Sequence, residues 1–156
     1  MNRPSKLEYA ALLAIVAGLR SEDPNTKVGC ILLDTNWRVV GTGYNGLPPS
    51  VELPEMERDE RLKYMIHAEQ NAVSACNGVP ITAVVTHSPC HSCLSLLVAK
   101  GIRQIYFIKR YWRESSDDQA KLFGIKIAPI HLESEVFLGF TDYANELVSA
   151  NQVGDV

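Results

Sequence analysis

The chain has no long apolar run and no excess of basic residues, and each absence excludes a class of protein. The longest apolar stretch, residues 10–19, is about half the length needed to span a bilayer. Residues 1–6 lack the charged-then-apolar layout of an export signal. The formal net charge is −3, so no broad basic surface is expected for a nucleic acid polymer. We therefore expect a cytoplasmic protein with small-molecule partners, not a membrane protein or a nucleic-acid binder.

Cysteine is also scarce. Four cysteines in a chain without an export signal argue against a disulfide framework and favour a reducing compartment. Cys30 and Cys76 lie among apolar or small residues, where a free thiol behaves as a small hydrophobic side chain. Cys90 and Cys93 instead form a P-C-x-x-C motif.

Neither repeats nor linkers divide the sequence, so one domain is expected over residues 1–156, with its core in residues 5–130. Hydrophobic periodicity and turn residues predict helices near residues 5–20, 67–76, 90–100, 116–123 and 141–150, and strands near residues 28–33, 37–42, 81–86, 104–108 and 125–130. Residues 43–63 are expected to form a long loop. This alternation predicts a three-layer α/β/α sandwich, in which a mixed five-stranded sheet carries helices on both faces.

Four residues predict a zinc site. His67 and Glu69 form H-A-E, and P-C-H-S-C brings Cys90 and Cys93 after a gap of twenty residues. One imidazole and two thiolates leave the fourth position of a tetrahedral zinc open for water, as in catalytic sites. The two cysteines share one face of a helix's first turn, where the helix dipole favours thiolates. We expect His67, Cys90 and Cys93 to hold one catalytic Zn²⁺ where the starts of two helices meet.

Glu69 is the natural proton carrier for such a site. It would take a proton from zinc-bound water and pass protons to a ring nitrogen and a departing amine, which is hydrolytic deamination. The pattern H-x-E…P-C-x-x-C is the signature of zinc nucleobase deaminases. Taken singly, the histidine could be structural, the C-x-x-C redox-active and the glutamate a dipole partner, but their coincidence in this order favours catalysis. His87 could approach the ion or the substrate, or only pack a loop.

Four longer segments are similar to the deoxycytidylate (dCMP) deaminase family. They are D-P-N-T-K-V-G-C-I-L-L-D (23–34), V-V-G-T-G-Y-N-G-L-P (39–48), H-A-E-Q-N-A-V (67–73) and S-P-C-H-S-C (88–93). The resemblance extends over about residues 5–130 and implies a cytidine deaminase-like fold. It also implies conversion of dCMP to dUMP and ammonia, which supplies dUMP for dTMP synthesis.

The resemblance also assigns the substrate pocket. It implies that Asn45 binds the deoxyribose, that Val28 packs against the pyrimidine and that the Ala68 backbone meets the polar edge of the base. Without the family context, Asn45 would be read as a turn residue and Val28 as strand core.

The 5′-phosphate has three candidate ligands, which are Lys27, Tyr111 and Arg113. Lys27 is preferred, since it is expected beside the pocket, whereas the other two follow the fourth predicted strand. Each could instead be a solvated surface group.

Regulation and assembly are further implications of the resemblance. Family members are often hexamers that dCTP activates and dTTP inhibits, and Gly43, Tyr44 and Gly46 match the loop linked to the regulatory site. Mg²⁺ could accompany a regulatory nucleotide. Residues 47–66 contain no cysteine or histidine, so no second zinc site is expected there. The expected location is the cytoplasm, or the host cytoplasm for a viral protein.

Two other interpretations stay open. A tRNA adenosine, guanine or riboflavin-pathway deaminase would use the same chemistry, but the net acidity argues against tRNA and G-Y-N-G favours the deoxycytidylate branch. A structural zinc or nucleotide-binding module without catalysis would not need Glu69 beside the metal.

Overall fold

A mixed five-stranded sheet forms the middle layer of the molecule. The computed structural model of the chain describes residues 3–153. The strands are β1 (Gly29–Leu33), β2 (Val39–Tyr44), β3 (Thr82–His87), β4 (Gln104–Lys109) and β5 (Lys126–Pro129). Their order is β2-β1-β3-β4-β5, with β1 antiparallel to both neighbours and β3, β4 and β5 parallel. β1 is buried along its whole length, as expected for a strand covered on both faces.

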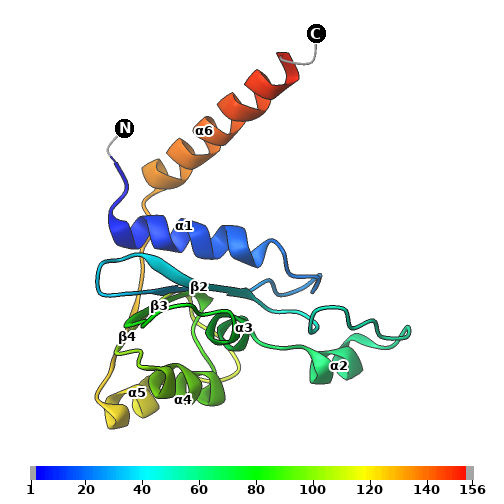
Figure 1. Cartoon of the computed structure of the whole chain (residues 1–156), viewed down its shortest axis with the longest axis vertical. Helices are drawn as coiled ribbons and strands as arrows, with labels where there is room; N and C mark the ends of the chain where they lie inside the picture. Colours follow the sequence, from blue (N-terminus) through cyan, green and yellow to red (C-terminus); the bar gives the residue numbers. More distant parts are fainter. Residues whose placement is uncertain (1–2, 154–156) are drawn as a thin grey trace.

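Helices cover both faces of this sheet (Figure 1). One face carries α1 (Lys6–Gly18), and the other carries α3 (Ala68–Ser74), α4 (His91–Lys100) and α5 (Asp117–Phe123). Successive side chains of β1 point to opposite faces of the sheet, so they pack in two separate core clusters. Ile31 and Leu33 pack in the cluster that contains the alanines of α1, whereas Cys30 and Leu32 pack in the cluster beneath α3 and α4. The predicted three-layer α/β/α sandwich is confirmed.

The start of α1 is set by a capping box. Ser5 Oγ accepts from the Glu8 backbone N–H at 3.1 Å, and Glu8 Oε2 accepts from the Ser5 backbone N–H at 2.7 Å. The buried residues of the helix are small, and they let it approach β1 closely. A Cβ built on Gly29 would lie only 1.8 Å from the Ala14 carbonyl oxygen.

The predicted loop at residues 43–63 is wrong at both ends. β2 continues to Tyr44, and the later part holds α2 (Arg58–Arg61) and the 3₁₀ helix η1 (Leu62–Tyr64). Neither short helix has a buried residue. Hydrophobic periodicity therefore gave no signal for them.

The last helix, α6 (Ser134–Val153), begins before the predicted start at residue 141. Thr141 lies inside this helix, where its hydroxyl donates to the carbonyl oxygens of Phe137 and Leu138. α6 projects away from the layers (Figure 1). Within residues 3–153, no helix has the length and apolar character required to cross a membrane.

Candidate functional site

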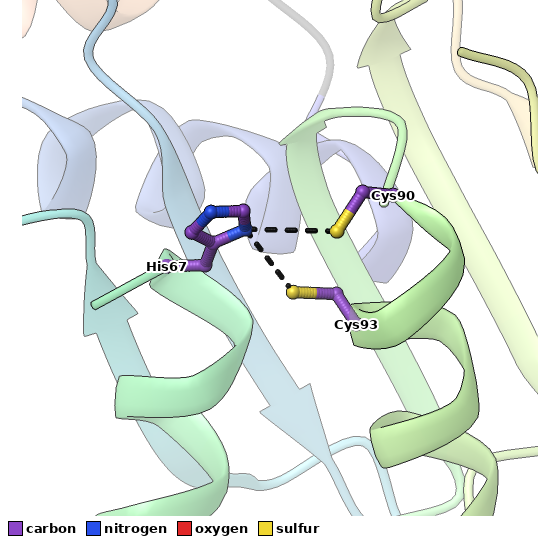
Figure 2. Close-up of side chains that lie close together, drawn as sticks. All are labelled: His67, Cys90 and Cys93. Carbon is purple, nitrogen blue, oxygen red and sulfur yellow. Dashed lines mark hydrogen bonds between the residues drawn. The ribbon is translucent and has the colours of Figure 1, made fainter. Parts of the chain in front are cut away.

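The starts of α3 and α4 meet over the sheet and bring three metal-binding side chains together (Figure 2). His67 is the N-cap of α3 and Cys90 is the N-cap of α4, with Cys93 in the first turn of α4. His67 Nδ1 lies 3.6 Å from Cys90 Sγ and 3.3 Å from Cys93 Sγ. All three donor atoms lie within 4.8 Å of one another. The predicted convergence of two helix starts is therefore present.

These distances fit a tetrahedral zinc ion. Zinc binds imidazole nitrogen at about 2.0 Å and thiolate sulfur at about 2.3 Å, so the nitrogen–sulfur edge of a tetrahedron is about 3.5 Å. Both nitrogen–sulfur distances lie close to that edge. The donor set also suits zinc, because imidazole and thiolate are its preferred ligands.

Hydrogen bonds within the cluster favour one thiolate. The Cys93 side chain, with smaller contributions from His67 and Ser92, lowers the pKa of Cys90 to about 3, although partial burial opposes ionisation. The hydrogen bond to Cys90 also raises the pKa of His67. The bond to Cys90, reinforced by burial, raises the pKa of Cys93. Metal binding at such a cluster would release protons.

Glu69 lies beside this cluster in the first turn of α3. Glu69 is only 4 % exposed, and it lines the same pocket as His67 and Cys90. Burial raises the pKa of its carboxyl group above the ordinary value. A buried carboxyl in the lining of a pocket is placed to exchange protons with a bound molecule rather than with bulk water.

A pocket of about 410 Å³ opens above these groups, a size that suits a small ligand. Its walls come from five parts of the chain: the turn before β1, the end of β2, the segment around α2, the end of β3, and the loop after β4. The loop after β4 is held in place by hydrogen bonds. The Tyr111 backbone N–H donates to Ser88 Oγ at 2.7 Å, and Ser116 Oγ donates to the Pro89 carbonyl at 2.8 Å.

Asn45, Val28 and Ala68, which the resemblance assigns to the substrate, all line the pocket. Asn45 also ties its wall together, because Oδ1 accepts from the Val28 backbone N–H at 2.8 Å and Nδ2 donates to the Thr26 carbonyl at 2.9 Å. An asparagine amide has two donors and two acceptor lone pairs. One donor and one acceptor lone pair of Asn45 are therefore left for a ligand.

The three phosphate candidates are placed differently. Tyr111 and Arg113 line the pocket. Lys27, the preferred candidate, is not among the pocket-lining residues, and its ammonium group donates to the Ser21 carbonyl. Arg113 stacks on the neighbouring Trp112 ring, with 4.8 Å between the guanidinium carbon and the ring centroid.

Of the residues matched to a regulatory loop, Gly43 and Tyr44 end β2 and Gly46 follows it, and their contacts tie this part of the chain to α3 and the residues before it. Gly43 is so close to α3 that a Cβ would lie 2.2 Å from the Ala68 carbonyl oxygen. The Tyr44 carbonyl accepts from Asn71 Nδ2 at 2.6 Å, and Gly46 exchanges backbone hydrogen bonds with Ile66. These contacts fix the start of α3, where His67 and Glu69 lie.

Sequence reasoning missed several pocket residues, above all Asp23, Arg58 and Trp112. Arg58 and Asp23 form an ion pair at 3.0 Å. They are separated by 35 residues, so no local pattern indicates that they meet. His87, for which two roles were open, lines the pocket, and burial lowers the pKa of its ring.

The chain is similar to known proteins in both sequence and structure. Residues 4–109 match the family described as "Cytidine and deoxycytidylate deaminase zinc-binding region". A probable deoxycytidylate deaminase from Caenorhabditis elegans is 36 % identical over 106 residues, which are 62 % of this chain and 54 % of the relative. The chain thus spans about half the length of that relative. Human deoxycytidylate deaminase is 30 % identical over 124 residues, covering 72 % of this chain and 70 % of the human protein.

Solved structures share the architecture. The apo crystal structure of dCMP deaminase from the cyanophage S-TIM5 aligns with a TM-score of 0.70, over 83 % of this chain and 100 % of the phage chain. The sequence identity of the pair is 22 %, so the similarity is one of fold. A second structure of the phage enzyme, in complex with dCMP and dUMP, aligns with a TM-score of 0.65.

Proposed function

Because the chain belongs to the cytidine and deoxycytidylate deaminase family, we propose that it hydrolyses dCMP to dUMP and ammonia. The observation that carries the proposal is the cluster of three metal-binding groups beside the buried Glu69 carboxyl, in one nucleotide-sized pocket. The relatives named deoxycytidylate deaminase support a deoxycytidine nucleotide as the substrate. The product, dUMP, would supply dTMP synthesis.

Zn²⁺ would be held by His67, Cys90 and Cys93, whose donor atoms have the spacing of a tetrahedral site. When bound, zinc supplies a Lewis acid that lowers the pKa of a water molecule at its open coordination position. The protein contributes the geometry, because both ligand-bearing helix starts are fixed by the sheet beneath them.

Glu69 would move the protons of the reaction. The oxygen of water forms a bond to C4 of the pyrimidine, and the bond from C4 to the exocyclic nitrogen breaks. One proton of the water ends on N3 and the other leaves with the amine as ammonia, so a single carboxyl group can carry both in turn. Its position in the pocket wall, sheltered from bulk water, supports this role.

The remaining pocket residues would orient the nucleotide. Val28 would pack against the base, the Ala68 backbone would meet its polar edge, and the free donor and acceptor of Asn45 would bind the sugar hydroxyl. Tyr111 and Arg113 would meet the 5′-phosphate, since both line the pocket. Lys27 is the weaker candidate, because its ammonium group is engaged by Ser21.

Regulation by dCTP and dTTP, with Mg²⁺ beside the effector, would act through Gly43, Tyr44 and Gly46. The contacts of this loop with the start of α3 support the idea, since any shift of the loop is transmitted to His67 and Glu69. A titration of activity with both nucleotides tests it, and an unchanged rate would remove it.

Assembly into a homo-oligomer, a hexamer by family resemblance, is supported by the exposed apolar stripe on α6. A second copy of the chain is the fitting partner by charge. α6 carries three acidic residues and no lysine or arginine between residues 134 and 151, whereas the N-terminal end of α1 offers Arg3 and Lys6 beside exposed Tyr9. The chain would act as one deaminase domain in the cytoplasm.

Ammonia release from dCMP and from deoxycytidine, measured in parallel with zinc-loaded protein, tests the proposed function. Turnover of dCMP with little turnover of deoxycytidine is expected. Turnover of deoxycytidine alone would keep the chemistry and reject the nucleotide substrate, and no turnover of either would reject the proposal.

A further inference from the structure

An arginine that no sequence motif indicated lies in the wall of the pocket. Arg58 begins α2, and its side chain lines the same cavity as His67 and Glu69. The side chain is 34 % exposed, so it is partly enclosed but accessible to a ligand. Among the residues that line the pocket, only Arg58 and Arg113 carry a permanent positive charge.

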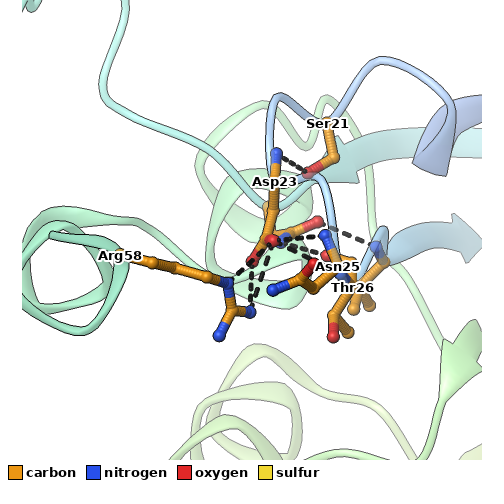
Figure 3. Close-up of polar contacts among 7 residues, drawn as sticks. Ser21, Asp23, Asn25, Thr26 and Arg58 are labelled. Carbon is orange, nitrogen blue, oxygen red and sulfur yellow. Dashed lines mark hydrogen bonds and ion pairs between the residues drawn. The ribbon is translucent and has the colours of Figure 1, made fainter.

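A buried aspartate holds this arginine in place (Figure 3). Nε and Nη2 of Arg58 donate to Asp23 Oδ1 at 3.3 Å each, and Nη2 donates to Asp23 Oδ2 at 3.0 Å. This is the fork geometry that fixes the plane of a guanidinium group. Within residues 3–153, the third guanidinium nitrogen, Nη1, makes no hydrogen bond to the protein.

Asp23 is held in place by hydrogen bonds that do not involve Arg58. It is 4 % exposed, and its Oδ1 accepts from the backbone N–H groups of Asn25 at 2.9 Å and Thr26 at 3.3 Å. Its own N–H donates to Ser21 Oγ at 3.2 Å. The carboxylate is thus a fixed part of the turn before β1, and the guanidinium group that it holds loses little further freedom when a ligand binds.

We infer that Arg58 recognises the 5′-phosphate of the substrate and thereby sets the preference for a nucleotide over a nucleoside, with Asp23 as its positioning residue. The inference rests on the proposed function and goes beyond it by naming the residue that selects the substrate class. The two N–H donors on Nη1 are free to bind a phosphate oxygen, and Arg113 supplies a second positive charge in the same pocket.

The competing explanation is that the ion pair only tethers α2 to the body of the protein. A matched control separates the two, because Arg61 lies on the same helix and pairs with Glu22 at 2.5 Å but does not line the pocket. Arg61 therefore also ties α2 to the body of the protein through an ion pair, but its side chain does not reach the pocket.

The test compares Arg58→Gln, Arg61→Gln and the wild type on dCMP and deoxycytidine. Arg58→Gln is expected to lower kcat/KM for dCMP by about 10- to 100-fold, chiefly through KM, because a charge-assisted hydrogen bond is lost. The kcat/KM for deoxycytidine should change by less than about threefold, because the nucleoside has no 5′-phosphate for Arg58 to contact. Arg61→Gln should leave the ratio of the two substrates unchanged.

Equal losses on both substrates in Arg58→Gln, or no loss on dCMP, would overturn the inference. Arg58→Lys covers the case in which Arg58→Gln does not fold. It keeps the charge but loses the planar fork, and an intermediate loss confined to dCMP is expected. Unchanged kinetics on dCMP in Arg58→Lys, or a loss shared by both substrates, would count against Arg58.

Binding measurements separate failure of the inference from failure of the proposed function. Calorimetric titration with dUMP and with deoxyuridine should show that Arg58→Gln weakens only dUMP. If the wild type does not deaminate dCMP, the proposed function fails, and the dUMP titration still decides whether Arg58 binds the phosphate. If the wild type deaminates dCMP and Arg58→Gln binds dUMP as tightly as the wild type, only the inference fails.

Discussion

At the scale of single residues, the site divides into a part that local sequence predicts and a part that it does not. His67, Cys90 and Cys93 fall within short motifs at helix starts, so their convergence could be expected from the combined ligand motif. Arg58 and Asp23 meet across 35 residues, and Arg58 lies in a segment without periodicity. Which side chain closes a pocket depends on how distant segments pack, and no local signal contains that information.

Replacing Glu69 by glutamine tests the catalytic assignment. Glutamine keeps the size of the side chain but cannot carry a proton, so kcat for dCMP should fall at least about 100-fold. Bound zinc, measured by atomic absorption, should stay at the wild-type level, since Glu69 is not one of the three clustered donors. Glu135→Gln on α6, outside the pocket, is the control and should behave as the wild type. A fully active Glu69→Gln protein would contradict the mechanism.

Asp23 should make the fold sensitive to acid. Burial raises the pKa of its carboxyl, but hydrogen bonds from Asn25, Arg58 and Thr26 outweigh burial and hold the pKa below the ordinary value. The stabilisation is therefore present above about pH 4 and is lost as the pH falls through the pKa of the folded state.

Urea unfolding of the wild type and Asp23→Asn at several pH values measures this effect. The wild type should be the more stable near pH 6, and the difference should shrink below about pH 4. A difference that is independent of pH would show that the Asp23 charge does not contribute.

At the scale of helices and strands, the order of the main elements could be predicted from the sequence. The exact ends of these elements and the two short exposed helices, α2 and η1, could not. The central helices and strands were predicted because buried faces impose a period on the chain. α2 and η1 bury no residue, and ion pairs of Arg58 and Arg61 with the turn before β1 hold this segment in place. β1 lies between β2 and β3, an arrangement set by long-range pairing that local patterns do not specify.

Gly43 shows how closely α3 depends on β2. In Gly43→Ala, the new Cβ would lie 2.2 Å from the Ala68 carbonyl oxygen and 2.3 Å from the Ala72 nitrogen, and neither backbone atom can move alone. α3 must shift, which should cost about 1–3 kcal/mol of stability and displace His67 and Glu69.

The urea midpoint and ammonia release of Gly43→Ala should therefore both fall. Gly46→Ala, just after β2, is the matched control, because its Cβ would meet no atom closer than 3.7 Å. If Gly43→Ala kept the wild-type midpoint and activity, tight packing of α3 on β2 would not be needed.

At the scale of the whole molecule, α6 is the element that the layers do not account for. Phe137, Phe140, Ala144, Leu147 and Val148 follow helical spacing and form one stripe. The four large side chains of the stripe are exposed, on a helix that projects from the body (Figure 1). Apolar stripes of this kind are usually covered by another chain or surface.

Light scattering after size-exclusion chromatography tests the proposed assembly. The wild type should be larger than a monomer, and Leu147→Glu should reduce its mass, because a charge in the stripe opposes burial. Glu146→Gln removes one acidic charge of the helix but leaves the apolar stripe intact, so it should lower the mass less than Leu147→Glu does. A monomeric wild type, or an unchanged mass in Leu147→Glu, would exclude this surface as the contact.

The donors of the metal cluster come from points far apart in the sequence, since His67 and Cys93 are separated by 26 residues. An ion held by both residues is in effect a reversible cross-link, present in the folded chain and absent from the unfolded one. By mass action, free zinc then adds RT ln(1 + [Zn]/Kd) to the free energy of unfolding, about 2.7 kcal/mol at a hundredfold excess over Kd. A chelator should lower the melting temperature and added zinc should restore it, so the zinc supply of the cell would govern how long the protein survives as well as whether it is active.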